Sequence, residues 1–355
     1  MKRAQGKRLD RTAWTDRSSG QETPRNRTAL PIEQCVLRLR KELKETSPLG
    51  EHGADAIKDE MQRRGCVHSI SRPTINRILQ RYGMFDGKRR QRRTAPPSGW
   101  YLPDVAKGLA ELDQFDFVED LCLEGGRLVH VFNGISLNGG LVMSCPESQM
   151  RAENTVRNLI AFWKEFGLPD YAQFDNSTVF QGSRKPDSLG KVIRFCLILG
   201  VVPVFVPPHE TGFQASIESY NGRWQRGVWQ RFHFENLRTV QQQSAKYVEA
   251  ARAKNASRRD ATPTRWELPK NWKLDYQLHP QGKVIFIRRA NNKGEVEVMG
   301  HRWILSATVA HRLVRAEVDL TENKIDFYRL RRREPENQEH LGTANYDLPK
   351  KPFCE

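Results

Sequence analysis

Three acidic residues in the middle of the chain could hold divalent cations. Asp116 lies within an alternating segment that predicts a strand, Asp175 follows a second short strand, and Glu218 lies near the start of a segment with helical spacing. Hard divalent cations prefer carboxylate oxygens. Two such ions about 3.5–4 Å apart can activate a water and stabilise the leaving oxygen in phosphoryl transfer. The pattern indicates such a site if the strand, strand end and helix converge.

Two other acids compete for these roles. Asp113 lies in the same predicted strand as Asp116, but alternation places Asp113 on the opposite face, with Phe115 and Phe117. Glu210 lies in the loop that precedes the helix. Taken singly, any of these acids could be an ordinary structural or surface carboxylate. The inference therefore depends on the joint arrangement.

The elements that must position these acids form an α/β pattern over residues 110–240. The strand candidates are 112–118, 127–135, 140–144, 171–174 and 201–206, and the helix candidates are 153–166, 189–199 and 213–232. In the last helix Asn221 shares the face of Glu218, where it could support the site, whereas Ile217, Trp224 and Val228 form an apolar stripe suited to packing. We expect a mixed sheet covered by helices.

Residues 30–95 predict a small helical domain of the helix-turn-helix type, with a first helix that begins at Leu30 and ends near 47–50 and a short second helix over 54–61. In its last helix Ser71 is a plausible N-cap, and an apolar stripe runs from Ile75 to Tyr82. The opposite face carries Arg72, Thr74, Asn76, Arg77 and Arg81. In a helix-turn-helix the outer face of the last helix enters the major groove of DNA. The alternative is a helical bundle whose charged face is only solvated.

Positive charge is concentrated at the N-terminal end. The chain carries a formal net charge of +16, and residues 1–100 hold 23 Lys+Arg against 11 Asp+Glu, a net of +12. A dense cluster follows the last predicted helix and consists of Lys88, Arg89, Arg90, Arg92 and Arg93. A localised basic segment favours a polyanionic partner, since neutralising phosphates releases counterions. The alternative is a basic tail that only aids solubility.

The remaining segments complete a multi-domain organisation. Residues 1–29 are polar and basic, which predicts a disordered tail, and residues 96–109 read as a linker. Residues 241–279 are predicted to be helical at first and then a linker. Five short alternating strands in 280–330 predict a small β-barrel, and 331–355 are expected to be a tail.

Composition excludes several classes of protein. No run of about 18 apolar residues is present, so we expect no transmembrane helix and no membrane partner. The N-terminus lacks the apolar region of a secretory signal. Six cysteines are scattered without CxxC pairs, as is ordinary for reduced thiols in a cytosolic protein. We therefore expect a cytoplasmic location.

The segment 110–240 resembles the ribonuclease-H-like catalytic core of retroviral-type integrases and of DDE transposases of bacterial insertion sequences. Three blocks in order carry the resemblance: LDQFD at 112–116, FDNSTVF at 174–180 and PPHETGFQASIESYN at 207–221. The predicted helix-turn-helix and barrel look like the flanking domains of integrase-like insertion-sequence transposases. The resemblance thus covers about residues 30–330, and its specificity lies in the order of the blocks.

The resemblance implies roles for particular residues. Asp116, Asp175 and Glu218 match the family's catalytic, metal-binding acids, and Asn176 matches the asparagine after the second acid. The implied cofactors are two Mg²⁺ ions, with Mn²⁺ as a substitute. The family usually has Gly after that asparagine, and this chain has Ser177. The second and third acids lie 43 positions apart, wider than in the retroviral pattern.

The implied function is that of a DNA transposase. Such an enzyme cleaves DNA at the element's ends and joins the 3′-OH to target DNA, so its partners are terminal repeats, target DNA and at least one further copy of the chain. The implied location is the bacterial cytoplasm, at the nucleoid when DNA is bound. The alternative is a catalytically decayed transposase that acts as a non-enzymatic, DNA-binding repressor.

Overall fold

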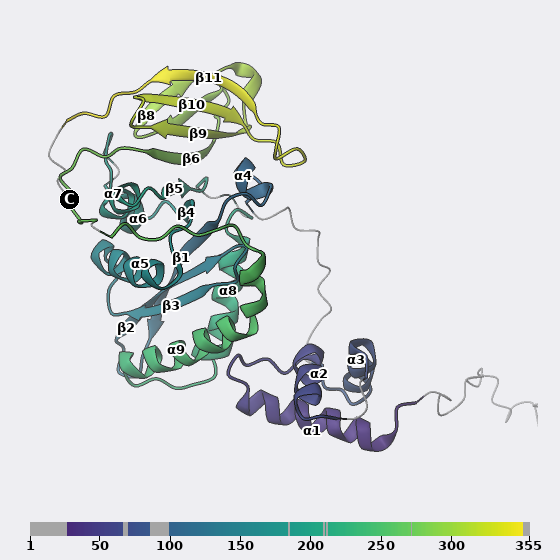
Figure 1. The fold of residues 1–355 in the computed structure, drawn as a ribbon. Coiled ribbons are helices and arrows are strands. Elements are labelled where there is room, and N and C mark those ends of the chain that lie inside the picture. The colour runs from purple at the N-terminus through teal and green to yellow at the C-terminus, as the bar shows by residue number, and fades with distance from the viewer. Residues whose placement is uncertain are drawn as a thin grey trace, which may run out of the picture. The chain divides into compact units, whose positions relative to one another are not determined.

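The computed structural model describes residues 27–66, 70–85, 99–183, 185–208, 210, 212–270 and 272–350. The chain divides into two compact units (Figure 1). The first contains residues 1–47 and 51–89, and the second contains residues 48–50 and 90–355. Among the described residues, no helix is long and apolar enough to cross a membrane.

The N-terminal unit contains three helices where the sequence predicted them. These are α1 (Leu30–Thr46), α2 (Ala54–Arg63) and α3 (Arg72–Arg81). The Ser71 side chain accepts a hydrogen bond from the backbone N–H of Thr74, so the predicted N-cap is confirmed. The three helices share one small core, to which each contributes fully buried side chains: Val36, Leu39, Ile57, Ile75 and Leu79.

The second unit is built on a mixed sheet. Strands β1 (Leu112–Cys122), β2 (Leu128–Ser136) and β3 (Val142–Glu147) pair antiparallel, while β4 (Tyr171–Phe174) and β5 (Val202–Phe205) lie parallel to β1. The order across this part of the sheet is β5-β4-β1-β2-β3. The expected mixed α/β core is confirmed, and it is consistent with the ribonuclease-H-like fold that the resemblance implies.

Helices cover both faces of this sheet. They are α4 (Pro103–Ala106), α5 (Ala152–Phe166), α6 (Thr178–Gln181), α7 (Lys191–Ile198), α8 (Ala215–Trp224) and α9 (Leu237–Lys254), with a π-helical turn η3 at Gln225–Trp229 and a 3₁₀ turn η4 at Ala256–Ala261. On one face Phe115 packs in a core with α5 and α7 residues. On the other face Val118 packs with residues of α8 and α9. Successive side chains of β1 point to opposite faces of the sheet, so this strand contributes to the core on each face.

The C-terminal strands do not close a separate barrel. Strand β6 (Lys283–Arg289) pairs in parallel with β5, and β9 (Leu313–Asp319), β10 (Lys324–Arg329) and β11 (Glu339–Asn345) continue antiparallel into one nine-stranded sheet. Only β7 (Glu295–Val298) and β8 (His301–Ile304) form a separate hairpin. A further 3₁₀ turn, η5, lies at Ala307–Val309. The prediction of a barrel over 280–330 is therefore wrong.

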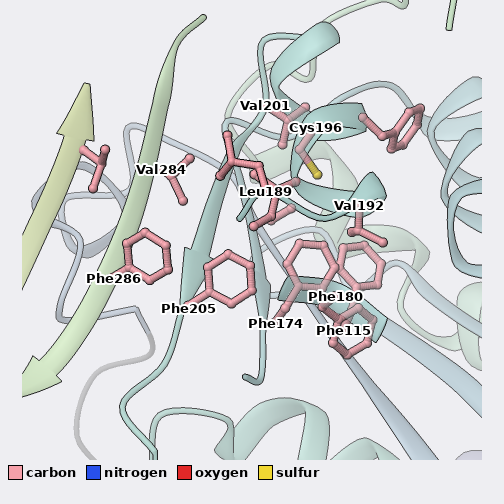
Figure 2. Packing of buried hydrophobic residues seen from close by; sticks show 14 of the residues in the cluster. Phe115, Phe174, Phe180, Leu189, Val192, Cys196, Val201, Phe205, Val284 and Phe286 are labelled. Carbon is pink, nitrogen blue, oxygen red and sulfur yellow. The ribbon is translucent and has the colours of Figure 1, made fainter. Parts of the chain in front are cut away.

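Side-chain packing explains this arrangement. The Phe286 ring of β6 stacks on Phe205 of β5 with a centroid distance of 5.3 Å. Both rings belong to the core that contains Phe115 and Phe174 (Figure 2). Alternation in sequence reports that one face of each strand is buried. It does not report which strand pairs with which. Here β6 pairs with β5, the strand that would otherwise form the open edge of the sheet.

Two segments expected to be a linker and a tail are partly packed. Trp100, Tyr101 and Leu102 are buried in a third core, although 96–109 was predicted as a linker. In the predicted tail 331–355, β11 joins the sheet, and Tyr346 and Leu348 are buried. The prediction of a disordered tail over 1–29 concerns residues of which 1–26 lie outside the described part of the chain. Residues 96–98 of the predicted linker and 351–355 of the predicted C-terminal tail also lie outside it.

Candidate active site

Asp116 is held from two sides. It lies in β1 directly opposite Asn133 of β2. Asn221, on α8, donates from Nδ2 to Asp116 Oδ2 at 2.8 Å, and Asn133 donates from Nδ2 to Asn221 Oδ1, also at 2.8 Å. The two asparagines therefore form a chain that fixes one carboxylate oxygen of Asp116, and Asn221 has the supporting position predicted for it.

Two of the predicted acids, Asp175 and Glu218, act electrostatically on the third, Asp116. Burial is the largest cause that raises the pKa of Asp116, and the neighbouring carboxylates of Asp175 and Glu218 add to it. Hydrogen bonds from the Phe117 backbone N–H and from Asn221 oppose this rise, and the resulting pKa is about 7. Asp175 at the strand end and Glu218 on the helix are thus near enough to Asp116 on its strand to raise its pKa.

The loop after β4 holds Asp175 in a defined turn. The backbone N–H of Ser177 donates to Asp175 Oδ1 at 2.9 Å. Asn176 donates from Nδ2 to the backbone oxygen of Val206 at 2.6 Å, which ties this loop to the end of β5. Ser177, which stands where the resembling transposases usually have Gly, has φ −65° and ψ 152°. Any residue adopts this extended conformation, so the backbone does not require Gly here.

A polar cleft of about 790 Å³ opens beside these acids. Asp175 and Glu218 line it, together with residues from the C-terminal strands such as Arg288 and Glu297. Its other charged lining residues are Lys185 and Glu210. The cleft therefore combines the half-buried Asp175 and the exposed Glu218 with cationic side chains.

The donor set suits a divalent cation in its chemistry. Carboxylate oxygens are the preferred ligands of Mg²⁺, and a bound cation would relieve the repulsion that raises the pKa of Asp116. Ser177 Oγ, which is buried in the same loop, has no hydrogen-bond partner among the described residues. Within that part of the chain, no three His, Cys, Asp or Glu side chains lie close enough to share one ion. Binding therefore requires the three acids to close further.

The competing acids are engaged elsewhere. Asp113 is fully buried and accepts two hydrogen bonds from Arg265, at 2.9 and 2.8 Å, and a third from Trp163 Nε1 at 3.0 Å. This carboxylate anchors the chain segment after α9. Glu210 forms an ion pair with Arg289. Neither acid contributes to the electrostatic environment of Asp116.

The residues predicted to bind DNA lie in the N-terminal unit. On α3, Arg72 and Arg77 are exposed, and Thr74 and Asn76 are half-buried. Arg72 forms an ion pair with Asp55 at 3.2 Å, and Arg81 pairs with the buried Glu33, so these two guanidinium groups already have protein partners. The cluster Lys88, Arg89, Arg90, Arg92 and Arg93 lies outside the described residues.

Sequence reasoning missed two polar residues near the acids. Asn133 is a buried amide within an apolar strand, a pattern that signals a hydrogen-bonded role, because burying an unpaired amide is costly. Arg288 lies 112 residues after Asn176, yet its Nη2 donates to Asn176 Oδ1 at 3.0 Å. No local pattern around Arg288 indicates this contact.

No protein-family model and no curated protein matches this sequence. Solved structures with similar folds include the catalytic core domain of BIV integrase, at 15% identity and a TM-score of 0.29, over 40% of this chain and 81% of that one. A chain of the simian T-cell lymphotropic virus intasome in complex with PP2A regulatory subunit B56 gamma matches at 13% identity and a TM-score of 0.33, over 58% and 64%. At these scores the likeness assigns no activity.

Proposed function

We propose that the chain is a DNA transposase that cleaves DNA at the ends of a mobile element and joins the freed 3′-OH to target DNA. The observation that carries this proposal is the electrostatic influence of Asp175 and Glu218 on the half-buried Asp116. These are the three acids that match the metal-binding positions in the order of the transposase and integrase motif. Asp113 and Glu210 do not match these positions, and each is paired with an arginine, Arg265 and Arg289 respectively.

Each residue of the site has a role in this proposal. Asp116, Asp175 and Glu218 hold two Mg²⁺ ions, for which Mn²⁺ can substitute. When bound, such ions activate a water or 3′-OH and neutralise charge on the reacting phosphate. Asn221 keeps Asp116 turned towards α8, and Asn176 keeps the Asp175 loop attached to the end of β5.

Recognition of the element belongs to the N-terminal unit in this proposal. The exposed side of α3 presents Arg77 and the half-buried Asn76, which suit contacts to bases and phosphates in the major groove. Pairing two ends requires at least a dimer on the DNA. The host compartment would be a bacterial cytoplasm, with the protein at the nucleoid when bound.

The test is a cleavage and joining assay with the full-length protein. Its substrate is linear DNA carrying the sequences that flank the protein's own gene, with Mg²⁺ and a supercoiled target plasmid. We expect nicked ends and joined products from the wild type. Asp116→Asn, Asp175→Asn and Glu218→Gln should each abolish both products while DNA binding persists.

Glu119→Gln is the matched control, because Glu119 is an exposed acid on the same strand as Asp116. It should leave both products unchanged. A wild-type protein that binds the flanking DNA but neither cleaves nor joins it under these conditions would contradict the proposal. That result would favour a non-enzymatic DNA-binding repressor.

A further inference from the structure

Arg288 of β6 is fixed in place beside the acidic loop. Its Nη1 donates to the backbone oxygens of Ile287 at 2.9 Å and Val206 at 3.3 Å, and its Nη2 donates to Asn176 Oδ1 at 3.0 Å. The guanidinium also lies over the Phe286 ring, 5.0 Å from its centroid. Arg288 lines the same cleft as Asp175 and Glu218. The C-terminal strands thus supply a rigid cation to the candidate active site.

The charge of Arg288 is not balanced by an ion pair. Its acceptors are two backbone oxygens and an amide oxygen, and none of the described carboxylates forms an ion pair with it. Burial therefore lowers the pKa of Arg288 to about 10, although the Glu297 carboxylate acts in the opposite direction. By contrast, Arg289, the next residue, forms an ion pair with Glu210.

Two N–H groups of Arg288 are left to bind a ligand. A guanidinium has five N–H donors, and the three hydrogen bonds described above use the two on Nη1 and one on Nη2. The Nε–H and the second Nη2–H have no acceptor among the described residues. They lie on adjacent nitrogens, the fork geometry with which arginine binds two oxygens of one phosphate.

We propose that Arg288 binds a phosphodiester group of DNA inside the cleft that Asp175 and Glu218 line. The inference rests on the proposed function, which makes DNA the substrate. Binding of an anion would balance the charge of Arg288, which has no ion pair in the described structure, while Asp175 and Glu218 in the same cleft hold the metal ions. The cleft volume of about 790 Å³ lies within the range of about 300–1,000 Å³ that encloses small molecules, so it has room for a nucleotide unit.

The first experiment is chemical footprinting of arginine. The full-length Glu218→Gln variant, which cannot turn over under the proposed function, is treated with phenylglyoxal in the presence of Mg²⁺. Modification of each arginine is quantified by peptide mass spectrometry, with and without a short duplex of the flanking DNA. We expect the duplex to slow modification of Arg288 at least about tenfold, which corresponds to about 1.4 kcal/mol. Arg329, which pairs with Glu339 on β10 and β11, should not change.

The second experiment separates a phosphate contact from a packing effect. Arg288→Ala should reduce the slope of log affinity against log salt concentration for the duplex by about 0.9, the value for one phosphate contact. Arg288→Lys, which keeps the charge, should restore most of the slope. Lys283→Ala removes a cation from the same strand that faces Glu317 and Asp319, and it should leave the slope unchanged.

Three results would overturn the inference. In one, Arg288 is modified equally fast when the duplex is bound. In another, inorganic phosphate protects Arg288 from modification, whereas a duplex that supplies the same total concentration of phosphate groups does not. That result would indicate a site for a free anion. In the third, the slope of Arg288→Ala equals that of the wild type. If the wild type cleaves and joins DNA but the bound duplex does not protect Arg288 from phenylglyoxal, only this inference fails. If the duplex protects Arg288 but the wild type does not cleave DNA, only the proposed function is contradicted.

Discussion

Asp113 and Asp116 lie three residues apart in β1 and have opposite electrostatic surroundings. Asp113 is fully buried but receives a bidentate pair from Arg265. Asp116 accepts hydrogen bonds from Asn221 and from the Phe117 backbone N–H, has no cationic partner among the described residues, and faces two further carboxylates. A paired buried acid stabilises its partner element, whereas an unpaired group of acids destabilises the free protein. This difference can be measured by substituting each residue.

Asp116→Asn should stabilise the free protein, and the gain should grow with pH. The pKa of Asp116 is about 7 in the folded chain against an ordinary 3.8. Between these values only the folded state keeps the proton, so stability falls as the pH rises through this window. At about pH 8, removing the acid should gain up to about 4 kcal/mol, and at about pH 5 less than half of that. Urea unfolding at both pH values tests this, and an equal gain at both would contradict it.

Asp113→Asn should have the opposite effect. It removes the closer of the two carboxylates that pair with the buried Arg265 guanidinium, at 2.8 Å, and leaves only Glu111 at 3.8 Å. Breaking a buried ion pair typically costs about 3–5 kcal/mol. The free energy of unfolding in urea measures this loss. The folded fraction of the variant should retain any strand transfer that the wild type shows. Loss of strand transfer from a stably folded Asp113→Asn protein, with Asp116→Asn active, would show that the catalytic acid is misassigned.

At the scale of single elements, α3 provides the test of DNA recognition. Arg77→Ala should lower the preference for flanking DNA over random DNA by about 1–3 kcal/mol, because a base contact in the major groove has this value. Arg77 is exposed, and its hydrogen bonds, to Pro73 O and Thr74 Oγ1, are long, at 3.4 and 3.3 Å.

Arg63→Ala is the matched control for Arg77→Ala, since Arg63 is an exposed arginine of the same unit at the end of α2. It should leave the preference for flanking DNA unchanged. Competition binding with flanking and random duplexes measures both variants. An equal loss of affinity for the two duplexes in Arg77→Ala would mean that this side chain contacts phosphate only.

Elements were predictable where periodicity is strong and local. The helices of the N-terminal unit and strands β1 to β5 lie within a few residues of their predicted positions. Strand β11 was missed because its sequence, EHLGTAN, has no apolar alternation and lies at the sheet edge with little burial. The helix predicted over 213–232 ends early, since η3 replaces its last turns.

The candidate site was predictable in its acids and not in its supports. Alternation in β1 already separates Asp113 from Asp116, because their side chains must point to opposite faces. The partners that decide their roles come from far along the chain, Arg265 from 152 residues away and Asn221 from 105. Arg288 was unpredictable for the same reason, since its contact exists only because β6 joins the sheet beside β5.

At the scale of the whole molecule, the nine-stranded sheet makes the C-terminal strands part of the unit that carries the candidate active site. Phe286 and Val284 of β6 are fully buried in the core that also contains Phe174 and Phe205 (Figure 2). Backbone pairing joins the same strands, with Val204 opposite Ile285. Continuous packing of this kind predicts one cooperative unfolding unit from β1 to β11, with the N-terminal helices as a separate unit.

Phe286→Ala tests this cooperativity. Removing a buried phenyl ring costs about 3–5 kcal/mol, which should lower the main calorimetric transition by roughly 10 °C without splitting it. Ile304→Ala is the control, because Ile304 of β8 is 79% exposed and its loss should shift nothing measurable. An independent C-terminal module would behave differently. Phe286→Ala would then produce a new low-temperature transition, while the transition of the β1–β5 core would stay in place. That result would show that the strand carrying Arg288 folds separately from the candidate active site.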